Sequence, residues 1–207
     1  MGVPLRQIAV GPALCSALRK LLRDVLRALE TFESDQPARA HFVRTRVKRI
    51  QSLARLVPRG VAWRKMFLPP CGELKDLFAE FRDASIILAL AEKYAPGEAH
   101  HLRLVARPDL KRAAYLTEYA EDVLSDYPDW SGLEWEKVAD RAVRTYRAAR
   151  QSWRQATCKN APDAAFHEWR LRVKRLFYQC EYLACRARLV RLTRRVDRLG
   201  ETLGQIQ

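Results

Sequence analysis

Two stretches of the chain, residues 41–49 and 167–175, combine one histidine with a dense set of cations. The first reads His-Phe-Val-Arg-Thr-Arg-Val-Lys-Arg and the second His-Glu-Trp-Arg-Leu-Arg-Val-Lys-Arg, so His, Arg, Arg, Val, Lys and Arg recur in register at a displacement of 126 residues. Guanidinium groups offer phosphate oxygens a planar fork of donors, and ammonium groups supply a point charge that tolerates many geometries. The repeated pattern therefore favours a polymer with regularly spaced phosphates over a single small ligand.

Helical geometry places three members of the first pattern on one stripe. At about 100° per residue, with His41 set at 0°, Arg44 falls at about 300° and Lys48 at about 340°. Arg49, at about 80°, flanks this stripe, whereas Arg46, at about 140°, lies well away from it. The opposite side is predicted to face the core through its apolar residues: Val43, Val47, Ile50 and Ala54.

The second copy repeats this separation of cations from core. His167, Arg170 and Lys174 form the equivalent stripe, Arg175 flanks it, and Arg172 points elsewhere. The predicted core residues here are Trp169, Val173, Leu176 and Cys180. A run of charges on a helix is usually only its solvated face. Solvation does not require the same cations at the same positions of two helices, so the recurrence favours a ligand.

The two histidines admit several chemical roles. An imidazole can ligate a metal, act as a general acid or base, or donate to phosphate when protonated. The i+4 positions hold Thr45 and Leu171, and no His-Glu-x-x-His motif occurs, which disfavours a zinc site built by one helix. For His41 and His167 both direct ligand contact and orientation of neighbouring side chains stay open. We expect no bound metal and no cofactor.

The composition indicates a basic globular protein. The chain has 207 residues, 48% of them apolar, and a net charge of +14 with a pI near 10.0, which suits an anionic partner. Lys and Arg outnumber Asp and Glu by 14 to 4 in residues 1–70 and by 17 to 5 in 137–198, while 71–136 carries 7 against 14. Each basic block therefore contains one copy of the repeat.

Cysteine usage and hydropathy bear on the compartment. The five cysteines include no Cys-x-x-Cys pair, which favours reduced thiols in a cytoplasmic protein. The longest apolar run, residues 84–91, is too short to span a membrane, so we expect no membrane partner.

The apolar spacing predicts an all-α fold. Sustained alternation of apolar and polar residues is absent, so we expect no sheet. Asp35 before Pro37 is a suitable helix start, and Ser131 with Glu134 reads as a capping box. Residues 58–72, with their prolines and glycines, are expected to form a connector. The expected helices cover 13–32, 35–58, 73–94, 109–125, 133–157, 162–186 and the remainder to 207.

The repeated His-x-x-Arg-x-x-x-Lys-Arg pattern resembles the CHAD family, the conserved histidine α-helical domains. The second copy is especially similar, with Phe166 before its histidine and Tyr178 after its last arginine. The stretch 146–150 resembles the basic helix that precedes the motif, and Phe81-Arg-Asp83 resembles an Arg-Asp signature that follows the first copy. The resemblance extends from Leu14 onward.

This resemblance implies one CHAD-like domain over residues 1–207, made of two pseudo-symmetric four-helix bundles. Repeat 1 would cover about 13–128 and repeat 2 about 131–207. The chain ends where a further helix is expected, so the second bundle is expected to lack its last helix. The family binds inorganic polyphosphate without catalysis in a basic groove or channel between its bundles, and some members associate with polyphosphate granules.

The family's basic positions carry over onto both copies of the motif. The implied polyphosphate-binding residues are His41, Arg44, Lys48, Arg49, His167, Arg170, Lys174 and Arg175. Secondary candidates are Arg19, Arg23, Arg27, Arg55, Arg147 and Arg150. The copies differ fourteen residues after the histidine, where the first has Arg55 and the second Glu181. The two faces are therefore expected to be electrostatically unequal.

Two other functions fit parts of this pattern. A nucleic-acid-binding helical protein agrees with the net charge, although the chain shows no helix-turn-helix signature or aromatic stacking platform. A metal-dependent phosphohydrolase would use His41, His167 and Asp83, but the motifs lack an acidic cluster dense enough to hold divalent ions. A non-enzymatic polyphosphate-binding protein is the leading hypothesis.

Overall fold

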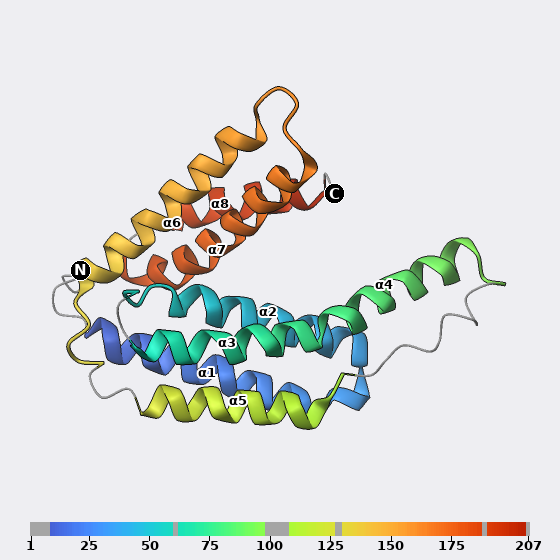
Figure 1. Cartoon of the computed structure of the whole chain (residues 1–207), viewed down its shortest axis with the longest axis horizontal. Coiled ribbons are helices and arrows are strands. Elements are labelled where there is room, and N and C mark those ends of the chain that lie inside the picture. Colours follow the sequence, from blue (N-terminus) through green and yellow to red (C-terminus); the bar gives the residue numbers. More distant parts are fainter. Residues whose placement is uncertain (1–8, 60–61, 98–107, 127–129, 188–189, 206–207) are drawn as a thin grey trace. The chain divides into compact units, whose positions relative to one another are not determined.

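The computed structural model describes residues 9–59, 62–97, 108–126, 130–187 and 190–205. Every regular element in these ranges is helical, which confirms the all-α prediction. In chain order the elements are α1 (Val10–Glu30), the short 3-10 helix η2 (Phe32–Ser34), α2 (Gln36–Ala54), α3 (Ala62–Leu77), α4 (Ala79–Tyr94), α5 (Leu110–Ser125), α6 (Trp135–Ala156), α7 (Asp163–Ala187) and α8 (Val190–Gln205) (Figure 1).

The expected connector at 58–72 is wrong, because α3 covers most of it and contains Pro69 and Pro70. A proline inside a helix costs about 3 kcal/mol. Phe67 and Leu74 on the same helix are at most 1% exposed, and burying each such side chain contributes about 1.5–3 kcal/mol. Burial of these two side chains therefore compensates for much of the cost of the two prolines. The expected helix 73–94 is helical apart from Phe78, where α3 ends and α4 begins, so the single predicted helix is divided in two.

The predicted helix caps have mixed outcomes. The Asp35 carboxylate accepts a hydrogen bond from the Ala38 backbone N–H at 3.2 Å, as expected of a residue at the start of α2. The capping box at 131–134 is wrong, because Glu134 itself precedes the first residue of α6 and makes no side-chain cap bond. Ser131 therefore lies too far upstream to cap the first turn.

The chain divides into two compact units. The first unit comprises residues 16–51 and 65–128, and the second comprises 1–15, 52–64 and 129–207. The division near residue 128 lies close to the expected boundary between repeats. However, the last residues of α2 and the first turn of α3 belong with the second unit, together with α6, α7 and α8.

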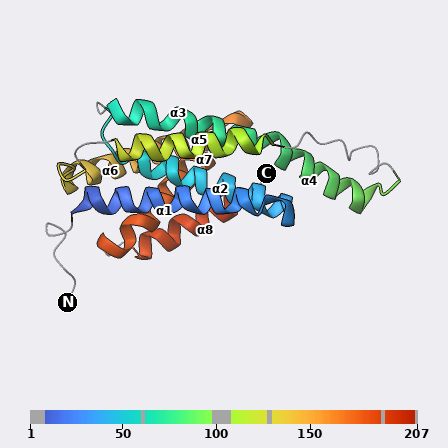
Figure 2. The ribbon, with the colours of Figure 1, turned by 90° about the horizontal axis from the view of Figure 1, so that it is seen from below.

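In the first unit, α1, α2, α3 and α5 run side by side, and α4 projects beyond the end of α3 (Figures 1 and 2). Phe32 lies at the centre of an aromatic contact, with ring centroids 5.7 Å from both Phe78 and Phe81. The predicted core face of α2 is confirmed, because Val43 and Val47 are fully buried. This packing leaves the histidine and cations of α2 on its other side.

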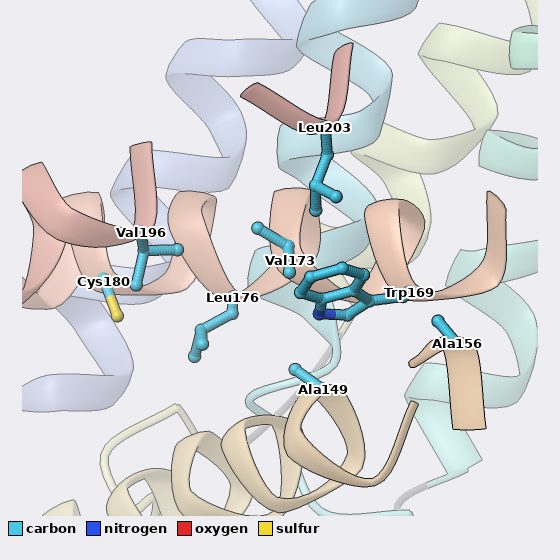
Figure 3. Packing of buried hydrophobic residues seen from close by; sticks show 8 residues of the cluster. All are labelled: Ala149, Ala156, Trp169, Val173, Leu176, Cys180, Val196 and Leu203. Atoms are coloured by element: carbon cyan, nitrogen blue, oxygen red, sulfur yellow. The ribbon is translucent and has the colours of Figure 1, made fainter. Parts of the chain in front are cut away.

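In the second unit, α7 packs against both α6 and α8. Trp169 of α7 lies against Ala149 of α6 and Val173, with Leu203 of α8 above them (Figure 3). The remaining members of this cluster are Ala156, Leu176, Cys180 and Val196. The predicted core face of α7 is therefore confirmed. Burial raises the pKa of the Cys180 thiol to about 11, which makes it a packing residue and not a nucleophile.

The order of helices repeats at the displacement seen in the sequence. Shifting α1, α2 and α3 by 126 residues gives 136–156, 162–180 and 188–203, close to the bounds of α6, α7 and α8. Helix α8 thus corresponds in sequence to α3. The pseudo-symmetric arrangement of two whole bundles stays a prediction.

Candidate cationic helix faces

The first candidate face lies on α2. His41 is exposed, while Arg44 and Lys48 are partly buried. Arg44 Nη1 donates to the backbone carbonyl of Lys75, near the end of α3, at 2.8 Å. Burial and the nearby Arg82 lower the pKa of Arg44, and two aspartates, Asp83 and Asp76, act against that lowering. This arginine is thus held by α3 and partly compensated by acids.

The sixth position of each copy has a packing role, in agreement with the helical projection. Arg46 lies 3.4 Å from the Asp24 carboxylate and 4.5 Å over the Phe42 ring. Arg172 lies 2.6 Å from the Glu168 carboxylate and donates to the Ala148 carbonyl of α6 at 3.1 Å. Both side chains are therefore occupied by contacts within their own unit.

The second candidate face lies on α7, where His167 is exposed. The side chains of Arg170 and Lys174 extend over two glycines of α8. A Cβ added at Gly204 would lie 3.5 Å from Arg170 Nη2, and one added at Gly200 would lie 3.2 Å from Lys174 Cε and Nζ. The bare backbone of α8 therefore leaves space for both cations to lie along it.

The flanking arginines are less exposed than the histidines of the stripes. Arg49 and Arg175 are both partly buried. Burial lowers the pKa of Arg175, and the nearby Glu168 acts against this. The structure thus places the flanking positions nearer to the protein interior than either histidine.

The secondary candidates separate into two groups. Arg19 donates to Ser125 Oγ at 3.2 Å and Arg23 lies 3.9 Å from Glu121, so both contact α5 and not the α2 stripe. The exposed candidates on α1 and α6 are Arg27, Arg147 and Arg150. Arg55 is partly buried just after the end of α2. Arg19 and Arg23 therefore link α1 to α5, and their part in polyphosphate binding stays a prediction.

The sequence interpretation missed a stripe of arginines on α8. Its members, all exposed, are Arg191, Arg194, Arg195 and Arg198. Their spacing of three and four residues places them on one side of the helix. That spacing is readable in the sequence and could have identified them.

A second missed group surrounds Arg64, in the first turn of α3. Arg64 is only 9% exposed, and the cations of Arg141 and Arg59 act on it along with those of Arg55 and Arg175. Arg55 and Arg175 were already candidates singly, but no local pattern joins them to the others, because the members come from three separate stretches of the chain.

Two negative results concern the described residues alone. No group of three or more His, Cys, Asp or Glu side chains in the described ranges is arranged to hold a metal ion. Among the helices that the structure describes, none has the length and apolar character needed to cross a membrane.

The fold and these faces define an all-helical protein with cations concentrated on repeated helices. Residues 13–207 match the CHAD domain family, so the chain belongs to that family. The comparison with curated proteins and that with solved structures each gave no match. The resemblance based on the two motifs is therefore confirmed.

Proposed function

We propose that this protein binds inorganic polyphosphate, without catalysing a reaction, through the cationic faces of α2 and α7. The observation that carries the proposal is the recurrence of His, Arg and Lys on one side of both helices, each backed by a buried apolar face. Membership of the CHAD family supports it, since that family is associated with binding of polyphosphate or triphosphate.

The chemistry of the faces suits a polymer of phosphates. A row of cations gains affinity from many weak phosphate contacts and from the counterions that these contacts release. Arg170 and Lys174 lie along the same stretch of α8, so their charges are presented in a row. The exposed arginines of α8 extend the positive surface of the second unit, and we include them among the binding residues.

The direct test is polyphosphate affinity as a function of salt, with Arg44, Lys48, Arg170 and Lys174 changed together to Glu. By analogy with single-stranded nucleic acids, losing four phosphate contacts should reduce the slope of log K against log salt by about 3. A folded variant, checked by circular dichroism, that retains wild-type affinity would rule out these faces as the binding site.

A matched control separates local binding from net charge. Four exposed cations elsewhere, Lys93, Lys111, Lys137 and Arg144, can be changed to Glu with the same loss of charge. We expect this control to retain most of the affinity at moderate salt, because screening limits long-range attraction to about 10 Å. Equal losses in both variants would instead indicate non-specific attraction.

Competition tests the nucleic-acid alternative. Polyphosphate should displace single-stranded RNA at equal phosphate concentration far more readily than RNA displaces polyphosphate. The reverse order would favour nucleic acid as the ligand.

A further inference from the structure

Five arginines gather around the end of α2 in the second unit. We call them the arginine cluster: Arg55, Arg59, Arg64, Arg141 and Arg175. Arg64 Nη1 donates to the Val57 carbonyl at 3.0 Å, and Arg141 Nε donates to the Arg55 carbonyl at 3.3 Å. These two bonds hold two guanidinium groups at one short segment, residues 55–57.

The positive charges around Arg64 act against one another. The pKa of Arg64 is lowered to about 10, first by burial and then by the positive charges of the other four arginines. No acid is among the groups that shift it. Burial, with Arg59 and Arg144, also lowers the pKa of Arg141, against which only Asp140 acts.

Helix capping explains only part of this arrangement. Cationic side chains near the end of a helix bind its last carbonyls and complement its dipole, which accounts for Arg64 and Arg141 at the end of α2. It does not account for Arg59, which is exposed and adds its charge to the same point. Like charges brought together in a partly buried place are stabilised when an anion joins them.

We propose that the arginine cluster is a compact site for a terminal phosphoryl group. The cations of the α2 and α7 stripes form rows, whereas hydrogen bonds hold the Arg64 and Arg141 guanidinium groups at one segment, residues 55–57, which lies beside Arg55 and Arg59 in the chain. Such a compact set suits a small, highly charged oxyanion such as pyrophosphate, because guanidinium groups can donate in pairs to its oxygens. The terminal phosphate of a polyphosphate chain offers the same oxyanion to the arginine cluster. Binding of that chain end rests on the proposed function.

Pyrophosphate is the probe for this site. Its binding to the full chain can be measured by calorimetry at constant ionic strength, beside the shift that it causes in melting temperature. We expect pyrophosphate to bind and raise the melting temperature. Changing Arg55 and Arg59 together to Gln, which leaves the bonds of Arg64 and Arg141 in place, should weaken binding at least about tenfold.

The control carries the same loss of charge on α6. Lys137 and Arg154 are exposed there, and the variant with both changed to Gln should bind pyrophosphate within about twofold of wild type, as expected for screened surface charges. If the Arg55/Arg59 variant does not fold, Arg59→Gln alone replaces it, because that side chain is exposed. Absence of pyrophosphate binding to wild type, or unchanged binding in the cluster variant, would overturn the proposal.

A competition experiment with long polyphosphate distinguishes the terminal site from the proposed function. Long polyphosphate with its terminal phosphates blocked as amides should bind the stripes but no longer compete with pyrophosphate, while unblocked chains should compete. Binding of long polyphosphate without any binding of pyrophosphate would leave the proposed function intact and refute the terminal site. Binding of pyrophosphate without binding of long polyphosphate would support the terminal site and refute the proposed function.

Discussion

The two copies of the motif differ most in what lies behind their cations. Behind α7 are Gly200 and Gly204 of α8, whereas the positions 126 residues earlier are Leu74 and Phe78, both fully buried or nearly so. In the first copy, Arg44 instead donates to the carbonyl of a residue near the end of α3. The motif of the second unit therefore has its cations along two glycines of α8. In the first unit, one cation of the motif, Arg44, is bound to the end of α3.

The charges around the copies differ in the same direction. Asp76 and Asp83 act on Arg44, while α8 adds four exposed arginines to the second unit. Glu181, which stands where the first copy has Arg55, opposes this difference by one position, but Arg55 itself belongs to the second unit. We infer that the second face contributes more to polyphosphate affinity than the first.

The largest expected effect comes from reversing the second pair of cations. Arg170→Glu with Lys174→Glu should weaken polyphosphate binding about a hundredfold, because each phosphate contact with a charged group is worth at least about 1.5 kcal/mol. Arg44→Glu with Lys48→Glu should weaken it only about tenfold, since Arg44 is already held by a carbonyl and compensated by acids. Titrations of the two folded variants at one salt concentration decide this. Equal losses, or a larger loss in the first pair, would break the inferred asymmetry.

The starts of α1 and α6 offer a second comparison, one of stability. A Cβ added at Gly11 would collide with the Trp130 carbonyl oxygen, which is backbone and cannot rotate away. Gly11→Ala should therefore destabilise the protein by about 2 kcal/mol, in the range of an overpacked core. The position 126 residues later is the exposed Lys137, where Lys137→Ala should stay within about 0.5 kcal/mol of wild type. Urea denaturation measures both, and a Gly11→Ala variant as stable as Lys137→Ala would contradict the close approach at Trp130.

The sequence predicted the faces of α2 and α7 because helical periodicity alone determines them. Val47 and Val173 are buried, and Arg46 and Arg172 point into contacts within their own units. It did not predict α3, because Pro69 and Pro70 are strong local signals against a helix. Burial of Phe67 overrides them, and burial depends on partners that are distant in the sequence.

The same distinction applies to the candidate sites. The α7 stripe follows from spacing within one segment, so the sequence contains it. The arginine cluster depends on residues 55–64 meeting Arg141 and Arg175 in space, and no local pattern encodes that meeting. The glycines of α8 are visible in the sequence, but the structure was needed to place Lys174 over Gly200.

The smallest expected effect tests whether the bare surface of α8 positions Lys174. Gly200→Ala should raise helix stability by up to about 1 kcal/mol, because alanine is the better helix former. Its Cβ would meet the flexible end of Lys174 at 3.2 Å and displace it, so polyphosphate affinity should fall by a factor of about three, less than the loss of a full contact. Gly204→Ala is the matched control, since its Cβ would make an ordinary contact with Arg170 at 3.5 Å and should add stability without loss of affinity. Denaturation and polyphosphate titration of both variants separate the two effects. If Gly200→Ala gains stability and keeps full affinity, the glycine serves only helix packing, and the contrast between the two copies reduces to their charges.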